Sequence, residues 1–183
     1  VYIPVKKIFF SLFSGNAGGI CETEQNFIRD IIYNFRLPKA ITALLAGTGL
    51  SLCGLQMQTL FRNPLADPYI LGVSASAGLG VALFIMGGSA LGINLGSAAF
   101  QTFGIAGAAM AGSILLLLLI LAVSEKLKDN LSLLIFGIMV SSIASALINL
   151  LQYASNESAL KMYVVWTLGS FTGLKSSQLL ILA

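Results

Sequence analysis

The placement of charged residues along this chain limits its fold more than any other feature of the sequence. Three long stretches contain no Asp, Glu, Lys or Arg: residues 40–61, 68–124 and 130–156. Across the whole chain 57% of residues are hydrophobic and only 9% are charged, whereas about a quarter of the residues in a typical soluble domain are charged. The sequence therefore predicts a membrane protein.

The lengths of the charge-free stretches predict the number of spans. A helix needs about 20 apolar residues to cross a bilayer, so the first and third stretches each hold one span and the middle stretch holds two. The break in the middle stretch is expected in GGSALGINLGS (residues 87–97), whose glycines and asparagine favour a turn. We predict an all-α, polytopic transmembrane helical bundle with spans at about 40–61, 69–86, 98–123 and 131–153, and the start of another at 177.

The N-terminal region differs from the rest of the chain. Residues 1–39 contain apolar side chains at helical spacing with charges between them, which predicts short interfacial helices before a transmembrane core at 40–183. The sequence begins with Val1, and no signal-peptide pattern precedes the first span. We expect either that a segment has been removed or that the sequence begins within a longer protein.

The composition excludes most catalytic and metal chemistry. The chain has no histidine, which is the commonest general base and metal ligand. Cys21 and Cys53 are too differently placed to suggest a disulfide or a metal site, and none of the five methionines is expected to bind metal. No Asp, Glu, Lys or Arg lies inside a predicted span, which disfavours a proton-driven carrier. We expect no catalytic residue, metal or cofactor, and no nucleic-acid partner.

Small residues recur at helical spacing in the first three spans, which allows helix backbones to approach closely in lipid. Packing is the expected role of these three sets: Ala43, Gly47, Ser51, Gly54 and Gln58; Gly72, Ser76 and Gly80; Gly104, Ala108 and Gly112. The fourth span carries a more polar stripe: Gly137, Ser141, Ser145, Asn149 and Gln152. This stripe could bond a neighbouring helix or line a water-filled path, and the pattern alone does not decide between them.

One polar stretch, LFRNPLADPYILG (residues 60–72), interrupts the apolar sequence. Asn63 before Pro64 disfavours continued helix, and Asp67 before Pro68 predicts a helix N-cap followed by proline at the first helical position. The stretch is therefore expected to end one span and begin the next, and Arg62 can extend to the lipid headgroups.

The motifs in residues 36–78 resemble those of a known family. The stretch RLPKAITALLAGTGLSLCGLQMQTLFRNPLADPYILGVSASAG resembles the FecCD family of ABC-transporter permeases, with an RLPR-type helix start, a small-residue helix, an RNPLA(D/E)P turn and an LG-S-GA restart. Lys39 replaces the usual arginine of the helix start, which keeps the charge but loses the forked geometry. GIMVSSIASALINLLQYASNESALKMYVVWTLGSF (residues 137–171) also resembles the pore-side helix and exit loop of the family.

The resemblance implies a function and partners. Members have ten transmembrane helices and import iron-siderophore, haem or cobalamin complexes across the bacterial cytoplasmic membrane, and this chain resembles helices two to five and the start of six. The implied partners are an ATP-binding cassette subunit, which hydrolyses the ATP, an extracytoplasmic substrate-binding protein, a second permease copy and membrane lipid. The permease itself is not expected to be an enzyme.

The resemblance also implies roles for residues. Arg36 and Lys39 correspond to positions that dock the binding protein. Residues of the fourth span are expected to line the translocation pathway: Ser141, Ser145, Asn149 and Gln152. The RNPLADP turn is expected to be cytoplasmic, and its key positions are Arg62, Asn63, Pro64, Asp67 and Pro68.

The family orientation conflicts with the distribution of basic residues. It places residues 1–39 outside, and it leaves three Lys and Arg residues in the cytoplasm and seven outside, whereas the positive-inside rule favours the reverse. We adopt the family orientation because the first helix of a full permease, absent here, usually dominates topology. Two alternatives remain: a scaffold subunit whose helices only pack, and a carrier that binds a coupling cation through carbonyls and hydroxyls. The sequence does not identify the transported chelate.

Overall fold

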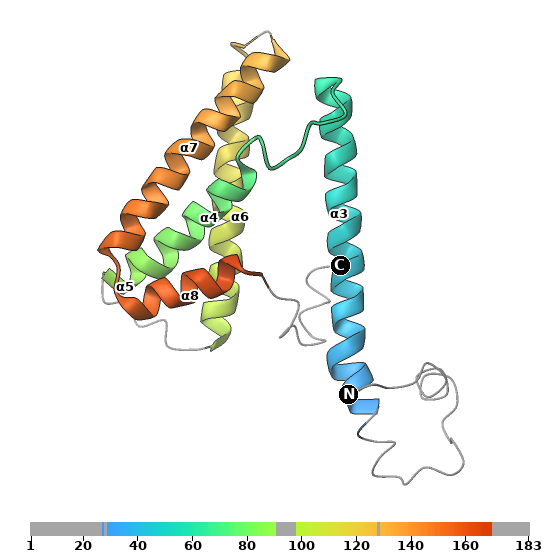
Figure 1. Cartoon of the computed structure of the whole chain (residues 1–183), viewed down its shortest axis with the longest axis vertical. Coiled ribbons are helices and arrows are strands. Elements are labelled where there is room, and N and C mark those ends of the chain that lie inside the picture. Colours follow the sequence, from blue (N-terminus) through green and yellow to red (C-terminus); the bar gives the residue numbers. More distant parts are fainter. Residues whose placement is uncertain (1–26, 28, 91–97, 128, 170–183) are drawn as a thin grey trace, which may run out of the picture. The chain divides into compact units, whose positions relative to one another are not determined.

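The computed structural model describes residues 27, 29–90, 98–127 and 129–169, and all regular secondary structure in these residues is helical (Figure 1). The chain divides into two compact units, residues 1–50 with 170–183 and residues 51–169. The described residues contain four helical segments long and apolar enough to cross a membrane: Arg29–Phe61, Val73–Ala90, Gln101–Ser124 and Asn130–Ala154. The prediction of an all-α protein with several spans is confirmed.

The first span begins earlier than the sequence predicted. A π-helical turn, η1 (Ile32–Arg36), leads directly into α3 (Leu37–Phe61), so helix covers positions that were expected to form a separate interfacial helix. The helix continues through Pro38, which has no N–H to donate. In the wider turn just before it, the N–H of Leu37 donates to the carbonyl of Ile32, five residues back.

The second span begins later than predicted and is built of three pieces. It comprises α4 (Val73–Ala82), the π-helical turn η2 (Leu83–Gly87) and α5 (Gly88–Ala90). The expected start at residue 69 is wrong, because residues 69–72 are still in turns and α4 follows Gly72. The predicted break at 87–97 is only partly described: helix continues to residue 90, and residues 91–97 lie outside the described part of the chain.

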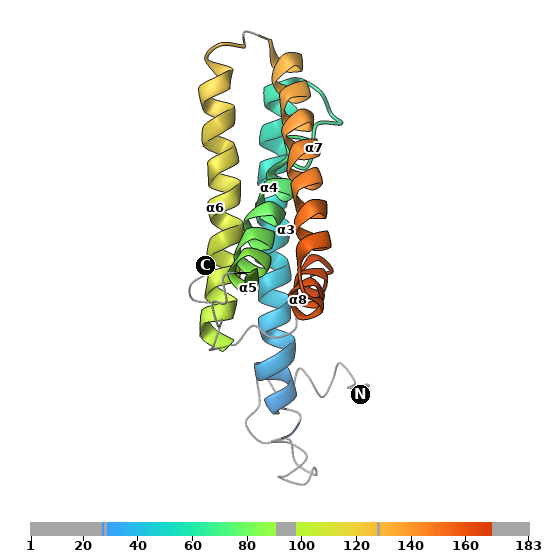
Figure 2. The ribbon, with the colours of Figure 1, turned by 90° about the vertical axis from the view of Figure 1, so that its left-hand side faces the viewer.

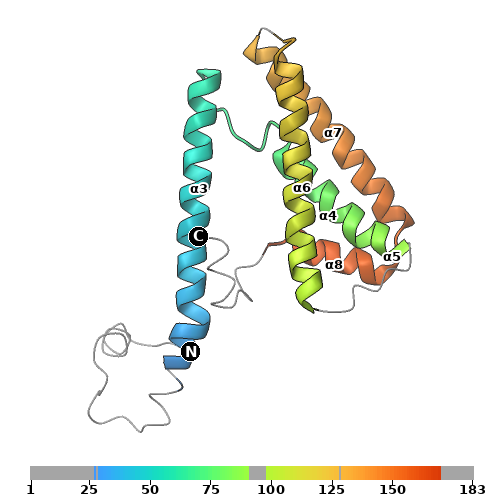
Figure 3. The same ribbon diagram turned by 180° about the vertical axis from the view of Figure 1, so that it is seen from behind.

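The remaining helices are α6 (Ala98–Ser124), α7 (Asn130–Ala154) and α8 (Glu157–Thr167). Helix α4 contacts both α6 and α7, and Figure 2 shows it running between them. The chain turns sharply after α7, so that α8 packs against η2 and the end of α4 (Figure 3). The sequence analysis did not predict α8 as a separate helix, and the span expected to start at residue 177 lies outside the described residues.

Two of the small-residue stripes pack against each other. A Cβ added to Gly80 would collide with the backbone carbonyl of Ala108, and one added to Gly112 would collide with the backbone carbonyl of Ser76. The backbones of α4 and α6 are therefore in direct contact, which only small residues permit. The prediction that these stripes serve packing is confirmed.

The stripe on α3 has a different environment. Among the described residues, no heavy atom outside the local helix lies within 4 Å of a Cβ built on Gly47 or Gly54. Gly47 and Gly54 belong to different units of the chain. The packing of this stripe therefore stays a prediction.

The core of residues 51–169 consists of two clusters. The larger cluster joins the second span to α7 and α8, and its fully buried side chains include Val81 and Ile85. The smaller cluster consists of Leu71, Leu116 and Ile120, with partly buried side chains from the end of α3 and from α7 packed on it. Many other apolar side chains are exposed, such as Leu115 at 69%, and a bilayer would cover them.

Candidate functional site

The four residues expected to line a path follow one stripe of α7. Ser141 is half-buried, and its hydroxyl donates a 2.9 Å hydrogen bond to the carbonyl of Gly137. Ser145 and Asn149 are exposed, and Gln152 is half-buried. Among the described residues, the side-chain amides of Asn149 and Gln152 have no hydrogen-bond partner. The stripe thus offers polar groups to water or to another helix, and its assignment to a path stays a prediction.

The polar stretch between α3 and α4 consists of residues Arg62–Gly72 and is here called the linker. It begins where α3 ends in a Schellman motif: the N–H of Arg62 donates to the carbonyl of Thr59 at 3.3 Å, and the N–H of Asn63 donates to the carbonyl of Gln58 at 3.2 Å. Arg62 has a φ of 48°, a left-handed conformation that glycine usually adopts at this position.

The linker continues as two turns of the same design. In the first, the N–H of Ala66 donates to the carbonyl of Asn63 at 3.1 Å, and the N–H of Leu65 donates to Oδ1 of Asn63 at 3.0 Å. In the second, Ile70 and Tyr69 donate in the same way to the carbonyl and Oδ1 of Asp67, at 3.1 and 2.9 Å.

A proline follows Asn63 and Asp67 at the second position of each turn, which fits the fixed φ of proline. From Arg62 to Ala66, every backbone N–H has a partner. The two Asx–Pro turns thus pair the backbone N–H groups of the first half of the linker without a helix. Their side-chain acceptors are the polar residues Asn63 and Asp67.

The predicted role of Asp67 as the N-cap of the second span is wrong. Its carboxylate accepts from Tyr69 within a turn, and α4 begins only at Val73, after Gly72 with a φ of 86°. A helix N-cap and an Asx turn both use the side-chain oxygen of Asp67 as an acceptor, so the local sequence did not distinguish them. The linker contains all five residues predicted for a cytoplasmic turn, and their position on the cytoplasmic side stays a prediction.

Helix α7 contacts the end of α3 and the last residues of the linker. Nδ2 of Asn130 donates a 3.0 Å hydrogen bond to the carbonyl of Leu60 in α3. At the second end of the linker, a Cβ on Gly137 would lie 2.9 Å from Cα of Leu71, and one on Gly72 would meet the hydroxyl of Ser141. Sequence analysis missed the role of Asn130, and no local pattern distinguishes it.

The two residues expected to dock a binding protein lie in the first unit. Arg36 ends η1, Lys39 lies one helical turn later, and both are exposed. Earlier on the same helix, the guanidinium of Arg29 lies over the ring of Tyr33 at 5.7 Å, a distance that favours a cation–π interaction. The docking role of Arg36 and Lys39 stays a prediction.

A polar contact joins the end of the second span to the start of α8. Oδ1 of Asn156 accepts from the N–H of Ala159 at 3.0 Å and so caps α8, while Nδ2 of Asn156 donates to the hydroxyl of Ser89 at 2.7 Å. The Asn156–Glu157 pair is a cap signal that sequence analysis could have used.

Outside the spans, Tyr163 on α8 is buried, and this burial raises the pKa of its hydroxyl.

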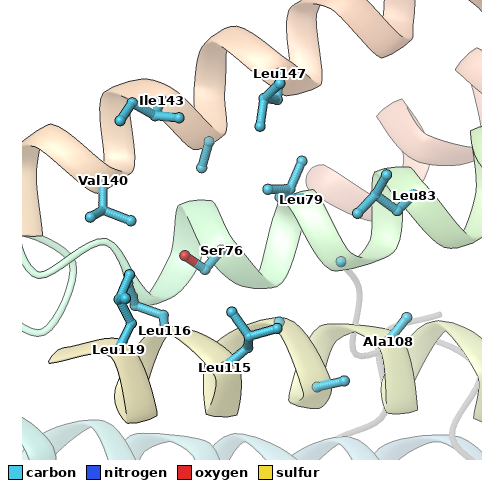
Figure 4. A pocket seen from close by; sticks show the side chains of 14 residues that line it. Ser76, Leu79, Leu83, Ala108, Leu115, Leu116, Leu119, Val140, Ile143 and Leu147 are labelled. Atoms are coloured by element: carbon cyan, nitrogen blue, oxygen red, sulfur yellow. The ribbon is translucent and has the colours of Figure 1, made fainter. Parts of the chain in front are cut away.

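A groove of about 400 Å³ lies between α4, α6 and α7 (Figure 4). Its lining is apolar except for the hydroxyl of Ser76. A charged or strongly hydrated cargo would lose its hydration here without gaining partners, so the groove is suited to hydrocarbon. Among the described residues, no group of three His, Cys, Asp or Glu side chains could hold a metal ion.

The chain matches known proteins over most of its length. It matches the FecCD transport family over residues 1–183. A probable iron chelatin transport system permease protein of Helicobacter pylori (strain ATCC 700392 / 26695) is 40% identical over 150 residues, which cover 81% of this chain and 42% of the relative. The molybdate import system permease protein MolB of Haemophilus influenzae is 35% identical, over 78% of this chain and 40% of the relative.

Two further comparisons agree. The vitamin B12 import system permease protein BtuC of Yersinia enterocolitica is 31% identical, over 80% of this chain and 42% of the relative. The structure of a metal-chelate type ABC transporter in an inward-facing conformation superposes with a TM-score of 0.72 at 32% identity, over 96% of this chain and 53% of that chain. The chain spans less than half the length of these curated relatives. It belongs to the FecCD transport family.

Proposed function

We propose that this chain is part of the permease subunit of an ATP-driven importer, and that the cargo is a metal chelate of the iron-siderophore, haem or cobalamin type. The match to the FecCD family along the whole chain carries this proposal. Two similar proteins point to metal chelates, the iron chelatin permease and the metal-chelate type transporter. MolB imports molybdate, so family membership alone leaves other cargoes open.

In this proposal the chain forms part of the membrane path and does not itself hydrolyse ATP. The chain belongs to a membrane permease family, and its described residues contain four helices long and apolar enough to cross a membrane, so it is a multi-pass protein of the bacterial cytoplasmic membrane. A separate ATP-binding cassette subunit would bind and hydrolyse ATP. Its closure would shift two permease copies between outward-open and inward-open forms, and the cargo would move inward between them.

Polar residues of α7 would line the path in this mechanism. Ser145 and Asn149 are exposed, and they share a helix face with Ser141 and Gln152. Hydroxyls and amides are neutral, so they can contact a hydrated chelate in passing without binding it tightly. A path of this kind favours release, which import requires.

The outer end of the permease would receive the cargo from an extracytoplasmic binding protein. Arg36 and Lys39 are exposed one helical turn apart, an arrangement that presents two positive charges to acidic side chains on a partner. With residues 1–39 on the outer side of the membrane, the linker would face the cytoplasm.

Uptake by cells tests the choice of cargo. Cells that lack the chain, and the same cells with the chain restored, are given radiolabelled ferric siderophore, haem, cobalamin and molybdate in separate experiments. We expect uptake of one of the three chelates to depend on the chain, and molybdate uptake to be independent of it. Loss of molybdate uptake alone would contradict the proposed cargo, and unchanged uptake of all four would contradict the importer itself.

A further inference from the structure

Helix α7 contacts the residues on both sides of the linker's course: the end of α3 and the last residues of the linker. At the end of α3, the hydrogen bond between Asn130 and Leu60 joins residues 70 positions apart in the sequence. The Leu60 carbonyl is one of the last four of α3, which have no partner within their own helix. Asn130 therefore caps a helix other than its own.

The geometry of Asn130 supports this assignment. It is the first residue of α7, directly after Asp129, whose extended backbone marks the helix start and whose side chain makes no capping hydrogen bond. Asparagine in the first turn commonly bonds backbone N–H groups nearby. Here its amide instead donates to α3, so the residue connects two helix ends.

The second end of the linker lies further along α7. Gly72 lies against Ser141 and the carbonyl of Gly137, which is 3.1 Å from a Cβ built on Gly72. From Asn130 to Ser141 the rise of an α-helix is about 16 Å. The contact of α7 with the end of α3 and its contact with Gly72 therefore lie about three helical turns apart on α7.

The middle of the linker is held by hydrogen bonds, and its second end by a small core. The two Asx–Pro turns pair its backbone, and Nε2 of Gln58 donates to the carbonyl of Pro64 at 3.1 Å. Leu71 is buried with Leu116 and Ile120, and partly buried side chains from the end of α3 and from α7 pack on them.

We propose that Asn130 is a positioning residue that fixes the end of α3, where the linker begins, on α7, so that the linker and the first three turns of α7 move as one body. The attachment by Asn130 goes beyond the proposed function, since it exists without transport. The joint movement of the linker and α7 rests on the proposed function, because α7 carries the stripe assigned to the path. A shift of α7 would then displace the linker by the same amount.

Two neighbouring substitutions isolate the Asn130 hydrogen bond. Asn130→Asp keeps the shape but replaces the donor by a carboxylate, which repels the carbonyl of Leu60. A negative charge at a helix start favours the helix dipole, so this variant should leave α7 itself intact. Asp129→Asn is the matched control, since it changes the adjacent side chain and leaves the amide of Asn130 in place.

The test measures a distance between two nitroxide labels by pulsed electron paramagnetic resonance. The labels are placed at Leu65 and Met139, which are 81% and 59% exposed, after Cys21→Ser and Cys53→Ser remove the native thiols. In membranes without nucleotide, we expect one narrow distance for the unmodified sequence and for Asp129→Asn, and a broad distribution for Asn130→Asp. A narrow distribution in Asn130→Asp would overturn the positioning role.

A second measurement needs no variant of Asn130. In the transporter assembled with its ATP-binding subunit, the Leu65–Met139 distance should stay the same with ATP absent and with ATP trapped. A changed distance would show that the linker moves independently of α7 and would overturn the inference. If no ATP-binding subunit assembles with the chain, the proposed function fails, while the nucleotide-free measurement still decides the role of Asn130.

Discussion

Asn130 at the start of α7 donates a 3.0 Å hydrogen bond to the carbonyl of Leu60 near the end of α3. This bond joins two spans at the point where each meets a loop. Together with the contact of Gly72 on Ser141, it brings the end of α3 and the end of the linker against one helix. The linker and the stripe predicted to line a path are therefore parts of the same structural region.

The Asx–Pro turns predict a specific stability effect at Asn63. Asn63→Ala removes the Oδ1 that accepts from Leu65, and we expect the free energy of unfolding to fall by about 1 kcal/mol. Asn63→Asp retains an acceptor oxygen and should cost less. Chemical denaturation in detergent compares the two, and equal effects would show that the hydrogen bond is not what Asn63 contributes.

The left-handed conformation of Arg62 predicts the opposite effect for glycine. At a φ of 48°, a side chain costs about 1–2 kcal/mol relative to glycine, so Arg62→Gly should raise thermal stability. Arg62→Lys keeps both the strain and the charge, and should leave stability unchanged. Destabilisation by glycine would mean that the Arg62 side chain contributes more than the strain costs.

The backbone contact between α4 and α6 predicts that glycines in this bundle differ in tolerance. Gly112→Ala should lower the free energy of unfolding by about 1–3 kcal/mol, since its new methyl group meets the backbone of Ser76. Gly107 lies on the same helix with no heavy atom within 4 Å of its Cβ position in the described structure. Gly107→Ala should therefore be neutral or slightly stabilising. Equal losses for both would refute the contact.

Thiol labelling tests whether the α7 stripe faces water. Ser145 and Ile143 are both exposed in the described structure but point to different faces of α7. In a chain without Cys21 and Cys53, Ser145→Cys should react with a water-soluble thiol reagent faster than Ile143→Cys, which lies on the apolar groove. Similar rates at the two positions would show that the stripe faces lipid or protein.

The docking proposal predicts a salt-dependent rate effect. Arg36→Glu reverses a charge at the expected outer end of the first span, and should slow association with the binding protein most clearly at low ionic strength. Surface plasmon resonance measures this rate. Basal ATPase activity of the assembled transporter should be unchanged. Unaltered association at low salt would contradict the docking role, and labelling of position 36 only from the cytoplasm would contradict the orientation as well.

Features with a local cause could be predicted from the sequence. The spans follow from the length of charge-free stretches, and the packing role of the stripes follows from small residues four positions apart. Which stripes meet, with Gly80 against Ala108 and Gly112 against Ser76, is shown only by the structure. The spacing also identified the polar stripe on α7, but it does not determine whether the stripe faces water, lipid or another helix.

Features set by distant contacts could not be predicted. Asp67 before Pro68 fits a helix cap and an Asx turn equally well, and the contact of Gly72 with α7 decides between them. The role of Asn130 depends on a residue 70 positions away. The early start of the first span depends on a π-helical turn before Pro38, for which the sequence carries no clear signal.

The energy source of uptake tests the central claim most directly. Membrane vesicles containing the chain with its ATP-binding subunit are loaded with ATP, supplied with binding protein and ferric siderophore, haem or cobalamin outside, and assayed for accumulation. We predict that accumulation of one chelate requires internal ATP and continues when a protonophore dissipates the ion gradient. Accumulation that is independent of ATP and abolished by the protonophore would contradict the account and would indicate a cation-coupled carrier.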